Sequence, residues 1–341
     1  MNQTNLFLMP DYFPLFSCKM GACRTVCCSG WQVSITLDNY FALIGTDCSE
    51  ELRRKMDCAL KPVDYPDEGK YATIHPNYFG ECPLRLADGR CGVQAELGED
   101  ILPDICRLYP RGVRCHGDHY EISLANSCEA VPELFLKRKE PIAFIEREWS
   151  MKLPPMPAEE LGSWAQRKAC IDVLQDRSRP LSARLASLGG RREKQVSEET
   201  TAALCALLQA LCEHSESIRL YGEKAIGYLA ENGYAAARER LETLLPDCDI
   251  FFEHLMVNHV FFSRYPFSER GLPVQDKFAA LAAVYALVRL MALGNAKSLE
   301  SLVDAVSAAF RLISHTDFDR TALHLLHKYS LMQKVEELIT V

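Results

Sequence analysis

Apolar residues recur with a helical period through the second half of the chain. Leu204, Leu207, Leu208 and Leu211 are spaced i, i+3, i+4 and i+7, which places them on one face of an amphipathic helix. A second stripe follows Ser298, a suitable N-cap, and consists of Leu299, Leu302, Val303, Val306, Phe310 and Ile313. Gly294 and Asn295 should end the helix before it. We therefore predict that the chain is mainly helical from about residue 140 onward.

The first 135 residues show a different pattern, because turn signals interrupt every apolar run. The stretches "PDEGK", "HPNYFGECP", "ADGR" and "YPRGVRCHGDHY" each break a short hydrophobic segment, so regular elements there should be short. The sequence "MKLPPMPAEELG" at 151–162 indicates a linker or a bend. We predict two parts, an irregular N-terminal module over 1–135 packed on a helical domain over 136–341.

The most apolar stretch, residues 278–293, is too short to cross a bilayer and contains Arg289, so we predict a buried helix and no membrane span. The start, "MNQTNLFLMPDYFPLF", lacks the basic, apolar and small-residue regions of a secretory signal, and we expect a cytoplasmic protein. The chain has 46 acidic and 38 basic residues, a balance that argues against a nucleic-acid or membrane-surface protein that binds through bulk positive charge.

Cysteine is the unusual feature of the composition. The chain has 15 cysteines, an odd number, and a reducing compartment disfavours structural disulfides, so metal binding becomes the leading interpretation. Most of these cysteines lie within the first 128 residues, and those beyond are Cys170, Cys205, Cys212 and Cys248. The sequence therefore places the chemistry in the N-terminal third, where metal–thiolate bonds would supply the stability that packing does not.

The thiols fall into two sets that are distant in sequence and that must converge to complete one site. The first set is Cys18, Cys23, Cys27 and Cys28, and the second is Cys82, Cys91, Cys106 and Cys128. The spacing lacks the paired CxxC of a zinc knuckle. Four thiolates on irregular loops suit an iron–sulfur cluster, and the absence of a regularly spaced histidine slightly favours it over a hydrolytic zinc site. The alternative is that several of these thiols are small buried hydrophobic side chains.

The cysteine blocks carry a family resemblance. The stretches "PDYFPLFSCKMGACRTVCCSGWQVSI", "GECPLRLADGRCGVQAELGEDILPDICRLYPR" and "FFEHLMVNHVFFSRYPF" resemble the flagellin lysine N-methylase (FliB-type) family. The cysteines are also similar to those of the wider YkgJ-like group of zinc- or iron-chelating proteins. The resemblance covers residues 9–295, and the eight cysteines of the two sets match the family's pattern. The chain departs from that pattern after Cys128, where Glu129 replaces the expected proline.

The resemblance implies a cytoplasmic enzyme that transfers methyl groups from S-adenosylmethionine to lysine side chains of flagellin. It also implies a [4Fe-4S] cluster held by cysteines, with zinc as the alternative metal. The sequence contains no GxGxG turn to mark a cofactor pocket and no CxxxCxxC triplet typical of radical chemistry, so polar methyl transfer is the simpler reaction.

Three residues beside Cys106 are candidates for that reaction. In "CRLYPR", Tyr109 would line the lysine channel, and Arg107 or Arg111 would hold the carboxylate of the cofactor. The alternative interpretation is a tyrosine that packs in a loop between solvated arginines. His254 and His259 are five residues apart and do not share a helical face, so we interpret them as packing or surface residues.

Two other classes of function remain open on the sequence. One is a non-enzymatic iron–sulfur or zinc protein that acts as a chelator or redox sensor, and the other is a structural zinc scaffold. Binding of S-adenosylmethionine separates the enzyme from the first class. Metal analysis separates the second, because zinc at unit stoichiometry without visible absorption would support a scaffold.

Overall fold

The structure is a computed structural model that describes residues 3–25, 27–28, 33–78, 80–154, 156, 158–159, 162–267 and 272–341. It is mainly helical, as the apolar periodicity predicts. The chain forms two compact units, and each consists of segments that are not contiguous in sequence. The first consists of residues 1–6, 17–113 and 148–157, and the second of residues 7–16, 114–147 and 158–341. The predicted boundary near residue 135 therefore falls inside a segment of the second unit.

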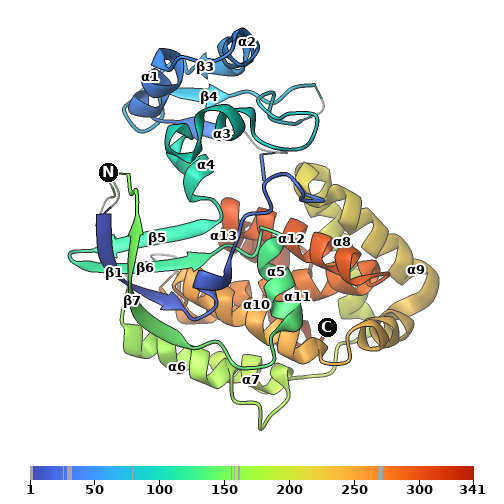
Figure 1. The fold of residues 1–341 in the computed structure, drawn as a ribbon. Coiled ribbons are helices and arrows are strands. Elements are labelled where there is room, and N and C mark those ends of the chain that lie inside the picture. The colour runs from blue at the N-terminus through green and yellow to red at the C-terminus, as the bar shows by residue number, and fades with distance from the viewer. Residues whose placement is uncertain are drawn as a thin grey trace. The chain divides into compact units, whose positions relative to one another are not determined.

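The first unit is built from short elements, as its turn-rich sequence predicts (Figure 1). They are β2 (Val33–Ile35), α1 (Leu37–Gly45), α2 (Glu50–Ala59), β3 (Leu60–Pro62), β4 (Ala72–Ile74), α3 (Gly92–Leu97), the 3-10 helix η2 (Glu99–Ile101) and α4 (Asp104–Leu108). Thr36 caps α1 by accepting a hydrogen bond from the Asn39 amide, and Ser49 caps α2 in the same way through the Leu52 amide.

A small antiparallel sheet in the order β2-β4-β3 organises the core of this unit. Ile74 lies opposite both Val33 and Leu60, and Ala72 lies opposite Ile35 and Pro62. The side chains that complete the core come from both flanking helices and from the loops around α3, and they include Leu43, Leu52, Met56, Leu84, Val93 and Leu102. Burial of each of these aliphatic side chains contributes about 1.5–3 kcal/mol to the stability of the fold. The loops that carry cysteines are thus anchored on an apolar base.

A four-stranded sheet has the order β5-β6-β1-β7. Its strands are β1 (Gln3–Pro10), β5 (Arg111–His116), β6 (His119–Leu124) and β7 (Phe144–Met151). β1 and β6 run parallel, with Phe7 opposite Tyr120 and Leu8 opposite Glu121. The short 3-10 helix η1 (Phe13–Leu15) follows β1.

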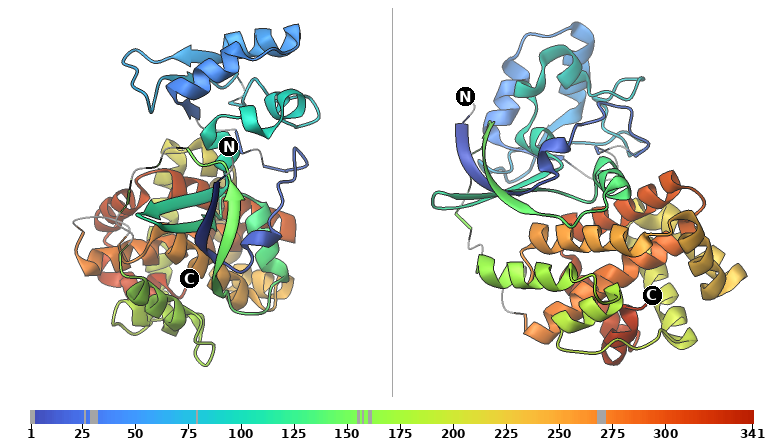
Figure 2. Two further views of the ribbon diagram at one scale, coloured as in Figure 1. Left: turned by 60° about the vertical axis from the view of Figure 1, so that its left-hand side comes forward. Right: turned by 60° about the horizontal axis from the view of Figure 1, so that its bottom comes forward.

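The second unit is dominated by helices, which the views of Figure 2 show gathered together. They are α5 (Ala130–Lys137), α6 (Trp164–Leu174), α7 (Leu181–Leu188), α8 (Glu198–His214), α9 (Glu216–Leu244), α10 (Cys248–Ser263), α11 (Val274–Asn295), α12 (Leu299–His315), α13 (Phe318–Lys328), the 3-10 helix η3 (Met332–Lys334) and α14 (Val335–Leu338). The predicted leucine stripe of α8 is buried throughout. Ser298 caps α12 in a capping box with Ser301, as its position before the stripe predicts.

Helix α11 is the centre of this bundle and packs against α8, α9, α12, α13 and α14. Gly294 allows the closest approach, because a Cβ there would overlap the backbone of Ala225 on α9. Within the described residues, α11 is also the one helix long and apolar enough to cross a membrane. The helix is therefore longer than the stretch that the sequence marked as too short to cross a bilayer, so that argument was wrong. Its whole apolar window is buried inside the fold, which agrees with the predicted buried helix.

Candidate functional site

Backbone contacts join the two thiol-bearing segments of the first unit. The Cys82 amide donates a hydrogen bond to the Cys28 carbonyl at 3.1 Å, so the end of the first cysteine set lies directly against the start of the second. The same loop then turns back. The Arg85 amide donates a hydrogen bond to the Cys82 carbonyl, and Arg85 pairs with Cys91 in an isolated antiparallel β-bridge. The fold thus brings segments more than fifty residues apart to one place.

Two glycines make a second close contact between these segments. Gly21 has φ +98°, and a Cβ there would lie 2.7 Å from the Arg90 amide nitrogen. Gly89 has φ +89°, and its Cβ would lie 2.6 Å from the Gly21 carbonyl oxygen. Since any side chain at either position would meet backbone atoms, both the conformation and the space require glycine. The loop after Cys18 is therefore locked onto the turn before Cys91.

The second cysteine set is held on the apolar core of this unit. Cys82, Cys91 and Cys106 are half-buried and pack against the core. Cys91 occupies the N-cap of α3, and Cys106 lies on α4. The rigid base fixes these three thiols, whereas Cys27 is exposed on the first segment.

The thiols of this region influence one another electrostatically. A hydrogen bond with Cys27 lowers the pKa of Cys28, but a hydrogen bond with Cys82, burial and the charges of Cys82 and Cys91 outweigh it and raise that pKa to about 12. The bond from Cys28 lowers the pKa of Cys82. Burial raises the pKa of Cys91 and of Cys106, and like charge on neighbouring thiols adds to both effects.

Five thiols therefore share one neighbourhood, namely Cys27, Cys28, Cys82, Cys91 and Cys106 (the thiol cluster). Within the described ranges, no three cysteine, histidine or carboxylate side chains converge in the arrangement of a metal site. Metal binding stays a prediction. The donor chemistry suits an iron–sulfur cluster or zinc, because both take four thiolates.

The remaining predicted ligands are Cys18, Cys23 and Cys128. Cys18 is exposed and its sulfur accepts a hydrogen bond from the Met20 amide at 3.4 Å, and Cys23 is half-buried in the same segment. Cys128 belongs to the second unit, in the turn that links β6 to α5, where the Val131 amide bonds to its carbonyl at 2.9 Å. Its role as a ligand stays a prediction.

The predicted cofactor and catalytic residues follow Cys106 directly. Arg107 is buried, forms an ion pair with Asp104 and donates a hydrogen bond to the Lys152 carbonyl. Tyr109 is the half-buried C-cap of α4. Arg111 is half-buried and bonds to the Arg107 carbonyl at 3.4 Å. Arg107 thus already has a structural role, and both arginines stay candidates for an anionic ligand.

The second unit contains a buried polar centre that the sequence analysis missed. Asn258 of α10 accepts a hydrogen bond from the Tyr12 hydroxyl and donates to the Leu124 carbonyl at 2.8 Å and to the Asn126 side chain at 2.5 Å. Asn126 in turn donates to the Leu255 carbonyl at 3.0 Å. Burial raises the pKa of Tyr12 well above its usual value, so its hydroxyl stays protonated. The available signal was an asparagine within the apolar run "HLMVNHVFF".

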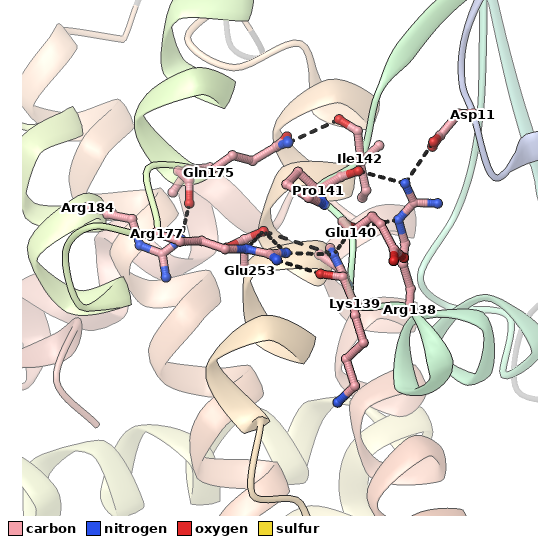
Figure 3. A network of polar contacts seen from close by, with 12 residues as sticks. Asp11, Arg138, Lys139, Glu140, Pro141, Ile142, Gln175, Arg177, Arg184 and Glu253 are labelled. Carbon is pink, nitrogen blue, oxygen red and sulfur yellow. Dashed lines mark hydrogen bonds and ion pairs between the residues drawn. The ribbon is translucent and has the colours of Figure 1, made fainter.

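A second network in the same unit surrounds the fully buried carboxylate of Glu253 (Figure 3). Arg177 approaches it at 2.8 Å and Arg184 at 2.6 Å. Both histidines of α10 are buried, which confirms the packing interpretation: burial lowers the pKa of His254 and of His259 to about 4. This network joins α10 to α7 and to the segment after α5, and the Glu253 carboxylate is paired with both arginines.

Comparison with known proteins bears on both units. The FliB lysine N-methylase C-terminal domain matches residues 208–340, which span most of the helical bundle. A "Lysine-N-methylase" of Salmonella typhimurium is 22% identical over 316 residues, which cover 88% of this chain and 70% of the relative.

The chain is therefore similar to lysine-N-methylases, and its C-terminal part resembles the FliB domain.

Other relatives support this comparison. A "Lysine-N-methylase" of Salmonella choleraesuis has the same identity and coverage. A "Flagellar biosynthetic protein FliU" of Salmonella muenchen is 26% identical over 142 residues, which cover 41% of this chain and 82% of that protein. No solved structure matches the chain. The domain match begins within α8 and extends to α14, so it does not include the thiol cluster.

Proposed function

We propose that this chain is a protein-lysine N-methyltransferase that uses S-adenosylmethionine as methyl donor and flagellin as protein substrate. The observation that carries the proposal is the similarity to lysine-N-methylases over 88% of the chain. The flagellar context of a further relative's name supports flagellin as the substrate. Methyl transfer to an amine needs no electron transfer, so the reaction does not require the thiol cluster to have a redox role.

Bound S-adenosylmethionine would supply an electrophilic methyl group on its sulfonium. The chain has to hold the lysine amine neutral and aligned with that methyl group, since only the free lone pair is nucleophilic. We assign Tyr109 to the lysine channel, where its hydroxyl can orient the amine. We assign recognition of the cofactor carboxylate to Arg107 or Arg111, since a guanidinium can bind a carboxylate through two hydrogen bonds.

We further propose that the thiol cluster holds a [4Fe-4S] cluster, with zinc as the alternative. Four of its five thiols would serve as ligands, and Cys128 would not. The two backbone contacts, at Cys28–Cys82 and Gly21–Gly89, support this choice because they hold both segments together without any metal. When bound, the metal centre would tie these loops to the core and so organise the segment that ends in Tyr109.

A non-enzymatic role as a chelator or redox sensor is the second candidate, and the thiol cluster is the observation that favours it. Calorimetry with S-adenosylmethionine distinguishes the two. Saturable binding supports the enzyme, and metal content without cofactor binding supports the alternative.

The proposed activity is tested by co-expressing the chain with flagellin and measuring the intact mass of flagellin. Each methyl group replaces a hydrogen on a lysine and adds about 14 Da. We expect mass steps of that size. Unchanged flagellin, with the metal centre loaded in the co-expressed chain, would contradict the proposal.

A further inference from the structure

The first unit exposes aromatic side chains at the start of α1. Phe41 is 54% exposed, and its ring lies 5.6 Å from that of Tyr40 and 6.0 Å from that of Tyr71 on the strand side of the helix. Tyr40 and Tyr71 in turn lie 5.0 Å apart. Ile44, one turn further along α1, is 36% exposed. Tyr40 and Tyr71 are half-buried and pack against the core, so they hold the exposed Phe41 ring through edge-on and tilted contacts.

Carboxylates surround these rings. The loop between β3 and β4 carries Asp64, Asp67 and Glu68, all exposed, and the Glu68 carbonyl accepts a hydrogen bond from the Leu37 amide at 3.0 Å. That bond ties the loop to the first turn of α1, where Asp38 is also exposed. Within the part of the chain that the structure describes, Asp38, Asp64 and Glu68 form no ion pair.

Acidic side chains outnumber basic ones in this region, and two of the five basic groups are engaged elsewhere. Residues 37–70 contain eight acidic and five basic side chains. Among the five, Lys55 pairs with Glu51 at 2.8 Å, and Arg53 donates to the Leu43 and Thr46 carbonyls at the far end of α1. Lys61 and Lys70 flank the loop itself. Asp38, Asp64, Asp67 and Glu68 outnumber Lys61 and Lys70, so the surface beside the exposed Phe41 ring carries a net negative charge.

We propose that this surface, formed by Asp38, Tyr40, Phe41, Asp64, Glu68 and Tyr71, docks a lysine-bearing segment of the protein substrate. An ammonium group is attracted both by a ring face and by carboxylates, and its apolar stem packs on the rings. The identity of the partner, flagellin, rests on the proposed function. Docking itself requires neither the methyl donor nor the metal.

Two variants test the surface, one by removing its aromatic contact and the other by removing its negative charge. Phe41→Ala removes the exposed ring. The triple variant D64N/D67N/E68Q removes three charges, while the carboxamide oxygen introduced at position 67 can still accept the hydrogen bond from the Lys70 amide. Leu220→Ala on α9 is the control for the first, because Leu220 is 57% exposed. E223Q/E231Q/E239Q, which changes three exposed residues of α9, is the control for the second.

The measurement is direct binding of flagellin to the full chain, without S-adenosylmethionine, by calorimetry. We expect each test variant to raise Kd by about fivefold or more, and both controls to leave it unchanged. Flagellin with acetylated lysines should bind the native chain as weakly as native flagellin binds the variants. Circular dichroism melts of each variant verify folding.

The outcomes separate this inference from the proposed function. Native affinity in both test variants, equal binding of acetylated flagellin, or no binding of flagellin by the native chain would overturn the docking surface. Binding that is weakened as expected, without any methylation by the native chain, would support the surface and contradict the proposed function.

Discussion

At the scale of single residues, cysteines of identical chemistry differ in their surroundings, and this difference predicts which of them bind the metal. Cys91 and Cys106 rest on the core of the first unit beside other thiols, whereas Cys170 and Cys205 are half-buried on helices α6 and α8 of the second unit. We expect Cys91→Ser or Cys106→Ser to abolish iron and methylation together, because serine does not replace a thiolate ligand. Cys170→Ser and Cys205→Ser should retain both. Iron and acid-labile sulfide assays after anaerobic purification measure the effect, and normal iron in the first pair would contradict the ligand assignment.

The buried histidines of α10 predict how stability depends on pH. Burial lowers the pKa of His254 and His259 to about 4 in the folded chain, while an unfolded histidine titrates near 6.5. The unfolded state therefore binds more protons between these values, so stability falls as pH drops from about 6.5 to about 4, by up to about 1.4 kcal/mol per pH unit for each histidine. We expect His259→Gln to make this dependence shallower than in the native chain. Urea denaturation at several pH values measures it, with the exposed His324→Gln as control, and an unchanged slope would refute the assignment.

Sequence reasoning predicted residues well where the signal was local. The leucine stripe of α8 and the Ser298 cap of α12 were predicted from spacing alone, because an isolated helix already contains that information. The Tyr12–Asn258–Asn126 centre was missed, since its members are up to 246 positions apart and each is an ordinary residue by itself. The same limit applies to Cys128: the spacing of a cysteine does not reveal which compact unit its turn joins.

At the scale of elements, the contact between the two cysteine segments depends on a pair of glycines. Gly89→Ala places a methyl group 2.6 Å from the Gly21 carbonyl oxygen and at a positive φ that alanine resists. We expect this variant to separate the loops and to lose metal, while the helical unit keeps its melting transition. Gly98→Ala is a matched control, because Gly98 also has positive φ but its Cβ would have nothing within 4 Å. Full metal occupancy in Gly89→Ala would show that the loop contact is not needed.

The network around Glu253 holds α10 to α7. Glu253→Ala leaves the buried Arg184 guanidinium without its carboxylate, so we expect a loss of about 3–5 kcal/mol of unfolding free energy. The exposed pair Lys168–Asp172 on α6 is the control, and Asp172→Ala should cost less than about 1 kcal/mol. Urea denaturation measures both, and an equal loss in the two variants would mean that burial does not govern the network.

At the scale of the whole molecule, apolar periodicity predicted a mainly helical chain with short N-terminal elements, and the structure confirms both. The assignment of non-contiguous segments to each unit could not be predicted from the sequence, because the parallel pairing of β1 with β6 joins residues more than a hundred positions apart. Residues 7–16 therefore fold with the helical unit although their neighbours in sequence carry the first cysteines. The family resemblance rests on cysteine blocks in one unit and on helices in the other, and the proposed activity requires both.

The central claim is that this chain places methyl groups on lysine side chains of flagellin. The most direct measurement is a reaction of the anaerobically purified chain with flagellin and S-adenosylmethionine that carries a trideuterated methyl group, followed by peptide mass spectrometry. We predict lysine residues heavier by about 17 Da, with fragments that place the label on the side-chain nitrogen. Label absent from every lysine, in a preparation that retains its metal and binds the methyl donor, would contradict the account.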